Sequence, residues 1–269
     1  MKNAKVLKPL LLSAAAVMLV VATMFATMAY LTSSAAVSNV FTIGNVKLHM
    51  YETKVNPDGT PAEVVEDGAM KSADTNSYHL QPGVTYQKDP TVYVDATSDK
   101  SYLFVRLRND LKTIEKGGAE TPTIVEQMRA KGWLEIERAE SNVDAVFVYV
   151  GTDAATIAAI QAIFSTVDGT TYDSYVDRAD AILDAAETAG INAKIVGGSG
   201  AREDIDVFEE FTLKTEIEGL ERFGGARIAI VAYAVQANGI GADNNHAVGS
   251  RGAFLEAWEY VKTELPFVS

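Results

Sequence analysis

Several short segments of the chain alternate apolar and polar residues with the period of two that is typical of β-strands. The stretch from Val37 to Tyr51 follows this pattern, and Gly44 divides it at a position suited to a bulge or bend. Thr91–Val94 and Tyr102–Leu107 predict two more strands, the second with clearly distinct faces. Residues 57–83 contain many turn formers and few large apolar side chains, so we expect a surface excursion there. The pattern favours antiparallel β-structure.

The period changes in the middle of the chain. Thr121 and Pro122 predict the N-cap and first residue of a short helix. The stretches Asp153–Phe164 and Asp173–Thr188 place apolar residues three and four positions apart, as in amphipathic helices. These two stretches are rich in alanine and acidic residues, unlike the strands on either side. We therefore expect a helical insertion at residues 152–200 on a β scaffold.

The last third returns to strand character. Asp206–Leu213 predicts one strand, and Ala226–Gln236 predicts the most apolar strand of the chain, with a central position because both of its faces are apolar. A closing helix follows, with Phe254, Trp258 and Val261 on one face. The expected fold is mainly β, an antiparallel β-sandwich with helical insertions.

The N-terminal segment has the pattern of an export signal. Three lysines lie within the first eight residues, and the run Pro9–Leu31 is uncharged and mostly apolar. A basic start, an apolar stretch and small residues at the exit predict a secretory signal peptide at residues 1–29. The run is about 20 residues long, which also suits a membrane anchor that is retained. Both alternatives place residues 30–269, as a single domain, outside the cytoplasm.

The cleavage point has two candidates. Cleavage between Ala29 and Tyr30 follows small residues, and Ser34-Ala35-Ala36 provides another acceptable small-residue site. A cut after Ala36 would remove about half of the uncharged segment that begins at Tyr30.

Composition agrees with an extracellular protein. The formal net charge is −13 and becomes −16 in the mature chain, because residues 1–29 contain three lysines and no acid. Such an excess disfavours nucleic acid and anionic membrane surfaces as partners, so we expect no nucleic-acid binding and, after cleavage, no membrane attachment. The chain has no cysteine, which removes disulfides, thiol catalysis and thiolate metal sites.

Motifs for catalysis are missing. The three histidines, His49, His79 and His246, form no H-E-x-x-H motif and no pair spaced for zinc. The run 197–200, Gly-Gly-Ser-Gly, lacks the lysine of a phosphate-binding loop and the final glycine of a nucleophile elbow. We interpret it as a linker. We therefore expect no catalytic residue, no metal ligand and no cofactor-binding residue.

Calcium is the one cofactor that stays open. Acidic side chains gather near two turns, but without the ligand spacing of an EF-hand loop. These residues are Asp58, Glu63, Glu66 and Asp67 at the first turn, and Asp204 and Asp206 at the second. Most of the tyrosines and both tryptophans fall in strand or helix patterns, and we expect them to pack in the core rather than to form a carbohydrate platform.

Four blocks, in order, resemble the TasA/camelysin group of exported Gram-positive proteins, whose signal peptides are processed by the SipW signal peptidase. The first block joins Ala29-Tyr30-Leu31-Thr32 to residues 39–48, Asn-Val-Phe-Thr-Ile-Gly-Asn-Val-Lys-Leu. The others are Gln81-Pro82-Gly83 with 88–92, then 232–237 with Gly239, then Ala257-Trp258-Glu259. The blocks bracket nearly the whole mature chain, but residues 111–205 match poorly. The resemblance implies a jelly-roll-like β-sandwich that is secreted to the cell surface or biofilm matrix and often forms fibres.

Two functional hypotheses follow. The first is a structural protein that forms homopolymers, or joins other matrix proteins, by strand addition. Residues 30–41 carry no charge, and Val37, Val40 and Phe41 are the candidate donor side chains for pairing with a sheet edge of the next subunit. The same residues are equally suited to the first strand of their own domain. The second hypothesis is a cell-surface ligand-binding protein or camelysin-like peptidase that uses the helical insertion as a lid or recognition module.

Overall fold

A computed structural model describes residues 32–35, 37–43, 45–62, 71–72, 76–139, 141–238 and 246–264, with only the backbone described for 32–35, 37–43, 71–72 and 263–264. Strands outnumber helices, and nearly all strand pairs are antiparallel. The strands are β1 (Thr32–Ala35), β2 (Val37–Ile43), β3 (Leu48–Thr53), β4 (Lys71–Ser72), β5 (Asn76–His79), β6 (Thr85–Gln87), β7 (Thr91–Val94), β8 (Ser101–Asn109), β9 (Trp133–Arg138), β10 (Asp144–Tyr149), β11 (Ile195–Val196), β12 (Glu203–Asp206), β13 (Glu210–Thr212) and β14 (Ile228–Gln236). The helices are α2 (Ile124–Ala130), α3 (Ala154–Val167), α4 (Tyr175–Thr188), α5 (Arg251–Glu264) and the 3₁₀-helix η1 (Leu220–Phe223).

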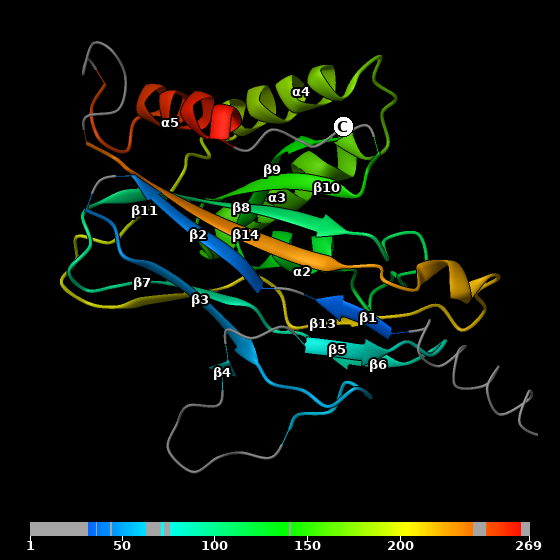
Figure 1. Ribbon diagram of the computed structural model, residues 1–269. Coiled ribbons are helices and arrows are strands. Elements are labelled where there is room, and N and C mark those ends of the chain that lie inside the picture. The colour runs from blue at the N-terminus through cyan, green and yellow to red at the C-terminus, as the bar shows by residue number, and fades with distance from the viewer. Residues whose placement is uncertain are drawn as a thin grey trace, which may run out of the picture.

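The largest sheet has six strands and forms the middle layer. Its order is β2-β14-β8-β10-β9, and β11 extends it beside β8. A second sheet, in the order β12-β7-β3-β4, faces it on one side, and two short pairs, β1-β5 and β13-β6, complete the strand layer. Helices α4 and α5 lie on the opposite side of the large sheet (Figure 1). The described chain therefore stacks helices, a large sheet and a group of smaller sheets.

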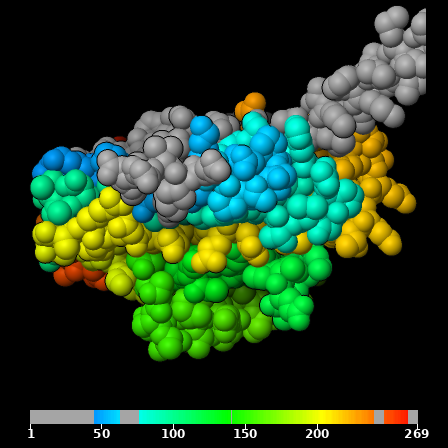
Figure 2. Space-filling view, turned by 90° about the horizontal axis from the view of Figure 1, so that it is seen from below, coloured from blue at the N-terminus to red at the C-terminus, as the bar shows by residue number. Residues whose placement is uncertain are grey.

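Two apolar clusters separate these layers. The first, between the large sheet and the smaller sheets, includes Leu48 of β3, Val92 of β7 and Val105 of β8. The second lies between the large sheet and the helices and includes Phe104 of β8 and Trp258 of α5. Figure 2 shows the surface from below: yellow residues lie between the blue and cyan residues of the N-terminal part and the green residues over the left and centre of the view.

Strand β8 illustrates how the sequence produces this arrangement. Leu103, Val105 and Leu107 point into the first cluster, and Tyr102 and Phe104 point into the second. The two-faced pattern predicted for this segment is confirmed. Both faces are covered, which explains why even its alternate positions carry aromatic rings.

Helix α2 begins two residues later than predicted. Its N-cap is Thr123, and not Thr121, because Thr123 and Glu126 form a capping box in which each side chain accepts a hydrogen bond from the backbone of the other residue. Pro122 therefore precedes the cap. The helices predicted from Asp153 and from Asp173 are present as α3 and α4, and their N-caps are Asp153 and Ser174.

Two other expectations need correction. The predicted surface excursion at 57–83 contains the short strand β5, where Tyr78 is buried because its ring packs against Tyr86 and Phe211. The single strand predicted at Asp206–Leu213 is present only in part: β13 covers residues 210–212, and Asp206 ends β12, which pairs with a different strand.

The closing helix is confirmed as α5, and Phe254, Trp258 and Val261 are all buried on its inner face. Strand β14 is confirmed as an inner strand between β2 and β8. One pairing departs from the antiparallel expectation, because β2 runs parallel to β14.

Candidate assembly site

The segment 32–43 occupies the edge of two sheets. Its second half, β2, is the terminal strand of the large sheet, and among the described strands it pairs only with β14. Its first half, β1, pairs with β5 in a separate two-stranded sheet. The parallel register with β14 aligns Val37 with Ile230, Val40 with Ala232, Phe41 with Tyr233, Thr42 with Ala234 and Ile43 with Val235. The three donor candidates predicted from the sequence thus lie together on one strand, at a sheet edge.

The receiving strand β14 is uncharged and largely buried. Ile230 and Ala232 face the cluster between the sheets, and Val235 faces the helices. None of the residues 228–236, 32–43 and 76–79 is an acid, a lysine or an arginine. Residues 32–43 therefore pair with β14 and β5 without burying an acid, a lysine or an arginine, although the protein as a whole carries a net charge of −13.

The backbone pairing of residues 32–43 determines which strand edges would be open to a strand from another copy of the chain. Without residues 32–43, β14 would expose one row of backbone N–H and C=O groups, and β5 would lose the partner that it has among the described residues. Unpaired strand edges of this kind accept an equivalent strand from another chain. The same geometry suits a strand of the protein's own domain and a strand supplied by a neighbouring copy.

Cleavage at the two candidate points would have different consequences for this site. Ala29 and Tyr30 lie outside the described residues. Ser34 and Ala35 lie within β1, so cleavage after Ala36 would remove the partner of β5 but leave β2.

The histidines lie on separate parts of the molecule. The ring of His49 stacks on Tyr93 with centroids 4.6 Å apart, and the guanidinium of Arg202 covers Tyr93 at 3.9 Å. This stack crosses the outer face of β3 and β7, so Tyr93 does not follow the core-packing expectation. His79 is exposed on β5, and Nε2 of His246 lies 3.4 Å from Oε1 of Glu256 near α5.

The acidic candidates for calcium are bonded within the protein. Asp58 accepts hydrogen bonds from Thr60, and Asp204 accepts them from Arg202 and Tyr51. Asp206 accepts a hydrogen bond from Thr91. Glu63, Glu66 and Asp67 lie outside the described residues. Across the part of the chain that the structure describes, no group of three histidine, aspartate or glutamate side chains could hold a metal ion.

The glycine-rich run at 197–200 is a turn. Gly197, Gly198 and Gly200 all have positive φ angles, of 73°, 68° and 76°, and they connect β11 to β12. Its position between two strands agrees with the interpretation as a linker.

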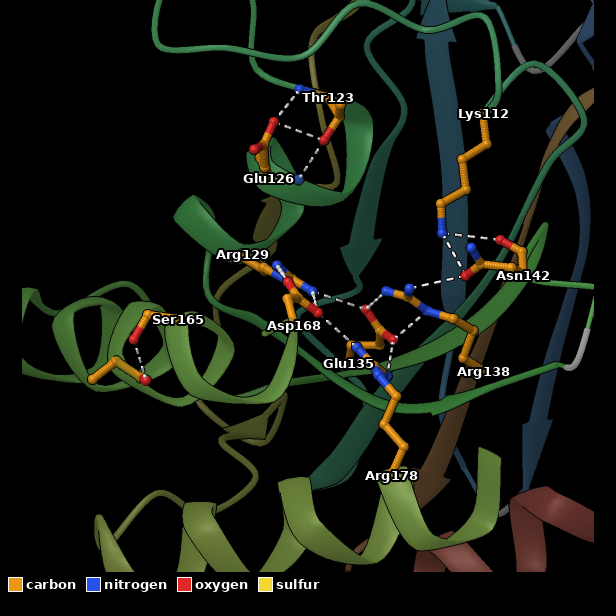
Figure 3. Close-up of polar contacts among 11 residues, drawn as sticks. Lys112, Thr123, Glu126, Arg129, Glu135, Arg138, Asn142, Ser165, Asp168 and Arg178 are labelled. Atoms are coloured by element: carbon orange, nitrogen blue, oxygen red, sulfur yellow. Dashed lines mark hydrogen bonds and ion pairs between the residues drawn. The ribbon is translucent and has the colours of Figure 1, made fainter. Parts of the chain in front are cut away.

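A buried ion network fixes the helical insertion to the large sheet (Figure 3). The side chain of Glu135, on β9, is completely buried and is 2.6 Å from both Arg138 and Arg178, and 3.3 Å from Arg129. Arg129 also binds Asp168 at 2.6 Å, and Arg178 binds the same carboxylate at 3.0 Å. The network therefore joins α2, β9, α4 and the end of α3.

The arginines of this network favour the ionised form of Glu135. Burial alone would favour the neutral acid, but the positive charges of Arg138, Arg178 and Arg129 hold the pKa of Glu135 below its usual value. The guanidinium of Arg129 also covers the ring of Phe164 at 3.6 Å. Sequence reasoning missed this cluster. The available signal was an acid, Glu135, placed between the apolar residues Leu134 and Ile136 of β9.

Compared with family models, with curated proteins and with solved structures, the chain matches none of them. Among the residues that the structure describes, no helix has the length and apolarity needed to cross a membrane.

Proposed function

We propose that this protein is a secreted structural protein of the cell surface or extracellular matrix, and that it polymerises by exchange of its N-terminal strands. The observation that supports the proposal is the placement of the uncharged segment 32–43 at the edges of β14 and β5. Released from its own edges, the segment pairs with the same edges of a neighbouring copy. A head-to-tail contact that does not close into a ring builds a filament.

The proposal includes the finer features expected from the sequence. These are a TasA/camelysin-like relationship, a jelly-roll-like connectivity of the sandwich, and removal of residues 1–29 by a signal peptidase of the SipW type. Cleavage starts the mature chain at Tyr30 and frees the end of the segment that must thread into the next subunit.

The fixed position of the helical insertion also favours a structural role. Glu135 binds arginines on α2 and α4 while it is itself fully buried. Opening the insertion as a lid would expose this charge network and the apolar cluster beneath α3 and α4.

The experiment that tests the proposal uses protein secreted by its native host. Its N-terminal residue is determined, and its size distribution and electron micrographs are recorded at rising concentration. The proposal expects a start at Tyr30 and filaments that disappear when residues 30–41 are deleted. A cleaved protein that stays monomeric at every concentration contradicts it.

Ligand binding is a second candidate because a cavity of about 460 Å³ lies between α2 and α3, lined by Arg129, Phe164 and Asp168 among others. Gln161, on its rim, is exposed. Gln161→Trp would obstruct a ligand there while leaving the ion network in place. Unchanged filaments with Gln161→Trp would separate assembly from any role of this cavity.

A further inference from the structure

Glu52, Asn76 and Lys88 form a polar trio inside the apolar cluster between the sheets. The Nζ atom of Lys88 lies 2.6 Å from Oε2 of Glu52, and Nδ2 of Asn76 donates to Oε1 of the same carboxyl group at 2.8 Å. Glu52 and Lys88 have no exposed surface, and Asn76 is 5% exposed. Glu52 belongs to β3, Asn76 begins β5, and Lys88 directly follows β6. The amine and the amide nitrogen therefore occupy the two oxygens of one carboxyl group.

Burial shifts each member of the pair toward its uncharged form. Burial lowers the pKa of the Lys88 amine, and burial raises the pKa of the Glu52 carboxyl. Transfer of one proton from Lys88 to Glu52 converts the ion pair to a neutral amine and a carboxylic acid. A neutral, desolvated lysine amine is a nucleophile, and a carboxylic acid beside it is a proton donor.

Hydrogen bonds with the backbone fix the side-chain amide of Asn76. Its Oδ1 accepts a hydrogen bond from the backbone N–H of Val55 at 3.1 Å, and its Nδ2 donates to the backbone oxygen of Thr53 at 2.8 Å. The Val55 N–H polarises the amide carbonyl and is already directed at the oxygen on which negative charge develops when a nucleophile adds.

Aromatic residues share strand faces with the trio, because Tyr78 follows Asn76 by two residues and Tyr86 precedes Lys88 by two. Tyr78 packs against Tyr86 with centroids 5.7 Å apart, and Tyr86 stacks on Phe211 at 5.1 Å. All three side chains are at most 1% exposed. Their burial excludes the water that would compete with the lysine amine for the Asn76 carbonyl.

We propose that Lys88 and Asn76 become joined by a covalent amide bond inside this protein, with Glu52 as the catalytic acid and base. The neutral Nζ of Lys88 adds to Cγ of Asn76, and the electron pair of the carbonyl moves to Oδ1, next to the Val55 N–H. Glu52 takes a proton from Nζ and delivers a proton to Nδ2. The Cγ–Nδ2 bond then breaks and ammonia leaves. A new Nζ–Cγ amide bond remains, Glu52 ends as it began, and no oxidant or cofactor is consumed.

The cross-link would strengthen the part of the molecule that, under the proposed function, holds neighbouring subunits together. It closes the chain between residues 76 and 88 and so ties β5 to the strand that follows it. Because Asn76 pairs with Ala35 of β1, the bond lies directly beside the N-terminal segment. A closed loop reduces the entropy of the unfolded chain, as a disulfide does, in a protein that has no cysteine. The bond does not depend on polymerisation.

Peptide mass spectrometry of the full-length or mature wild-type protein tests the proposal. Trypsin cuts after a free lysine but not after one whose amine is acylated. The proposal predicts that cleavage after Lys88 is absent and that the peptide 72–100 is lighter than its sequence by one ammonia, without backbone fragments between residues 76 and 88. A peptide ending at Lys88 with its full mass overturns the proposal. So does a loss of ammonia with normal cleavage at Lys88, because that result indicates a succinimide at Asn76.

Variants test the roles of Glu52 and Asn76 in forming the bond. Glu52→Gln and Asn76→Ala are each expected to restore cleavage after Lys88 and the full peptide mass, whereas Lys54→Arg, an exposed lysine close to the same strand, leaves the loss of ammonia unchanged. Asn76→Asp is expected to lose one water in place of ammonia. A Glu52→Gln protein that folds, as judged by circular dichroism, and still forms the bond contradicts the role of Glu52. The wild-type masses decide whether the bond exists even if a variant does not fold.

Discussion

Oε1 of Glu135 lies 2.6 Å from Nη1 of Arg178, although the two residues are 43 positions apart in the chain. The contact crosses from the edge strand β9 of the large sheet to helix α4. Because Glu135 also binds Arg129 and Arg138, a single buried carboxylate connects β9 to both α2 and α4.

Removal of the Glu135 carboxylate should destabilise the folded protein. Glu135→Ala leaves three arginines without their shared partner, and breaking a buried charge network costs about 3–5 kcal/mol. The free energy of unfolding, measured with urea, should fall by this amount. Lys262→Ala is the control, because Lys262 pairs with the exposed Glu259 and such a pair contributes about 0–1 kcal/mol. Equal losses in the two variants would contradict the structural role given to Glu135.

Glu115 should make stability depend on pH. Burial raises its pKa from 4.5 to about 7, even though its carboxyl accepts hydrogen bonds from the Ile124 backbone and from Asn109. The folded-state pKa is above the unfolded value, so the stabilisation is complete below pH 4.5 and is lost as the pH rises through 7. Over that range the contribution is about 3 kcal/mol.

The comparison between variants isolates this effect. Unfolding in urea at pH 5.5 and pH 8 should show a larger loss of stability for the wild type than for Glu115→Gln, which has no proton to release. Glu218→Gln, at an exposed position, should keep the wild-type slope. An unchanged slope in Glu115→Gln would show that this carboxyl does not titrate in the folded protein between these two pH values.

Gly132 is required by both its conformation and its neighbour. Its φ angle is +81°, and a Cβ atom there would meet the backbone carbonyl of Gly151. Gly132→Ala should therefore cost about 3 kcal/mol, the sum of left-handed strain and backbone displacement. Gly190 has a similar φ of +70° with open space around it, so Gly190→Ala should cost only about 1 kcal/mol. Thermal unfolding that ranks the two variants in the reverse order would contradict the packing described at Gly132.

The strands and helices with strong periodic patterns could be predicted from the sequence. The alternation in β8 and the apolar stripe of α5 each depend on near neighbours, and both were predicted correctly. The N-cap at Thr123 was missed because Thr121-Pro122 provides an equally plausible local signal, and only the reciprocal bonds with Glu126 decide between them. Strand β5 was missed because its inward residues, Asn76 and Tyr78, include a polar one.

The polar clusters could not be predicted because they have no local pattern. Glu52, Asn76 and Lys88 come from three different segments, and each alone resembles an ordinary surface residue. Their significance arises when the fold buries all three together. The donor candidates Val37, Val40 and Phe41 were found from an uncharged sequence, but the strands with which they pair are known only from the structure.

Assembly should become faster as salt is added. Copies of the mature chain, with a net charge of −16, repel one another, and about 0.1 M salt shortens the range of this repulsion to about 10 Å. The exchanging segment and both receiving edges contain no acid, lysine or arginine, so salt screens the repulsion without weakening the contact itself. Light scattering at increasing sodium chloride should record faster growth of filaments. Slower growth would indicate that ion pairs hold the subunits together.

A chain that can accept a strand but cannot supply one tests strand exchange most directly. A variant beginning at Asn45 retains β14 and β5 but lacks β1 and β2. Added in small amounts to the mature protein, it should bind the strand offered by the last subunit and stop growth, so that filaments in electron micrographs become shorter as its proportion rises. Filaments whose length does not change with this variant, while it remains folded in the same solution, would contradict polymerisation through residues 32–43.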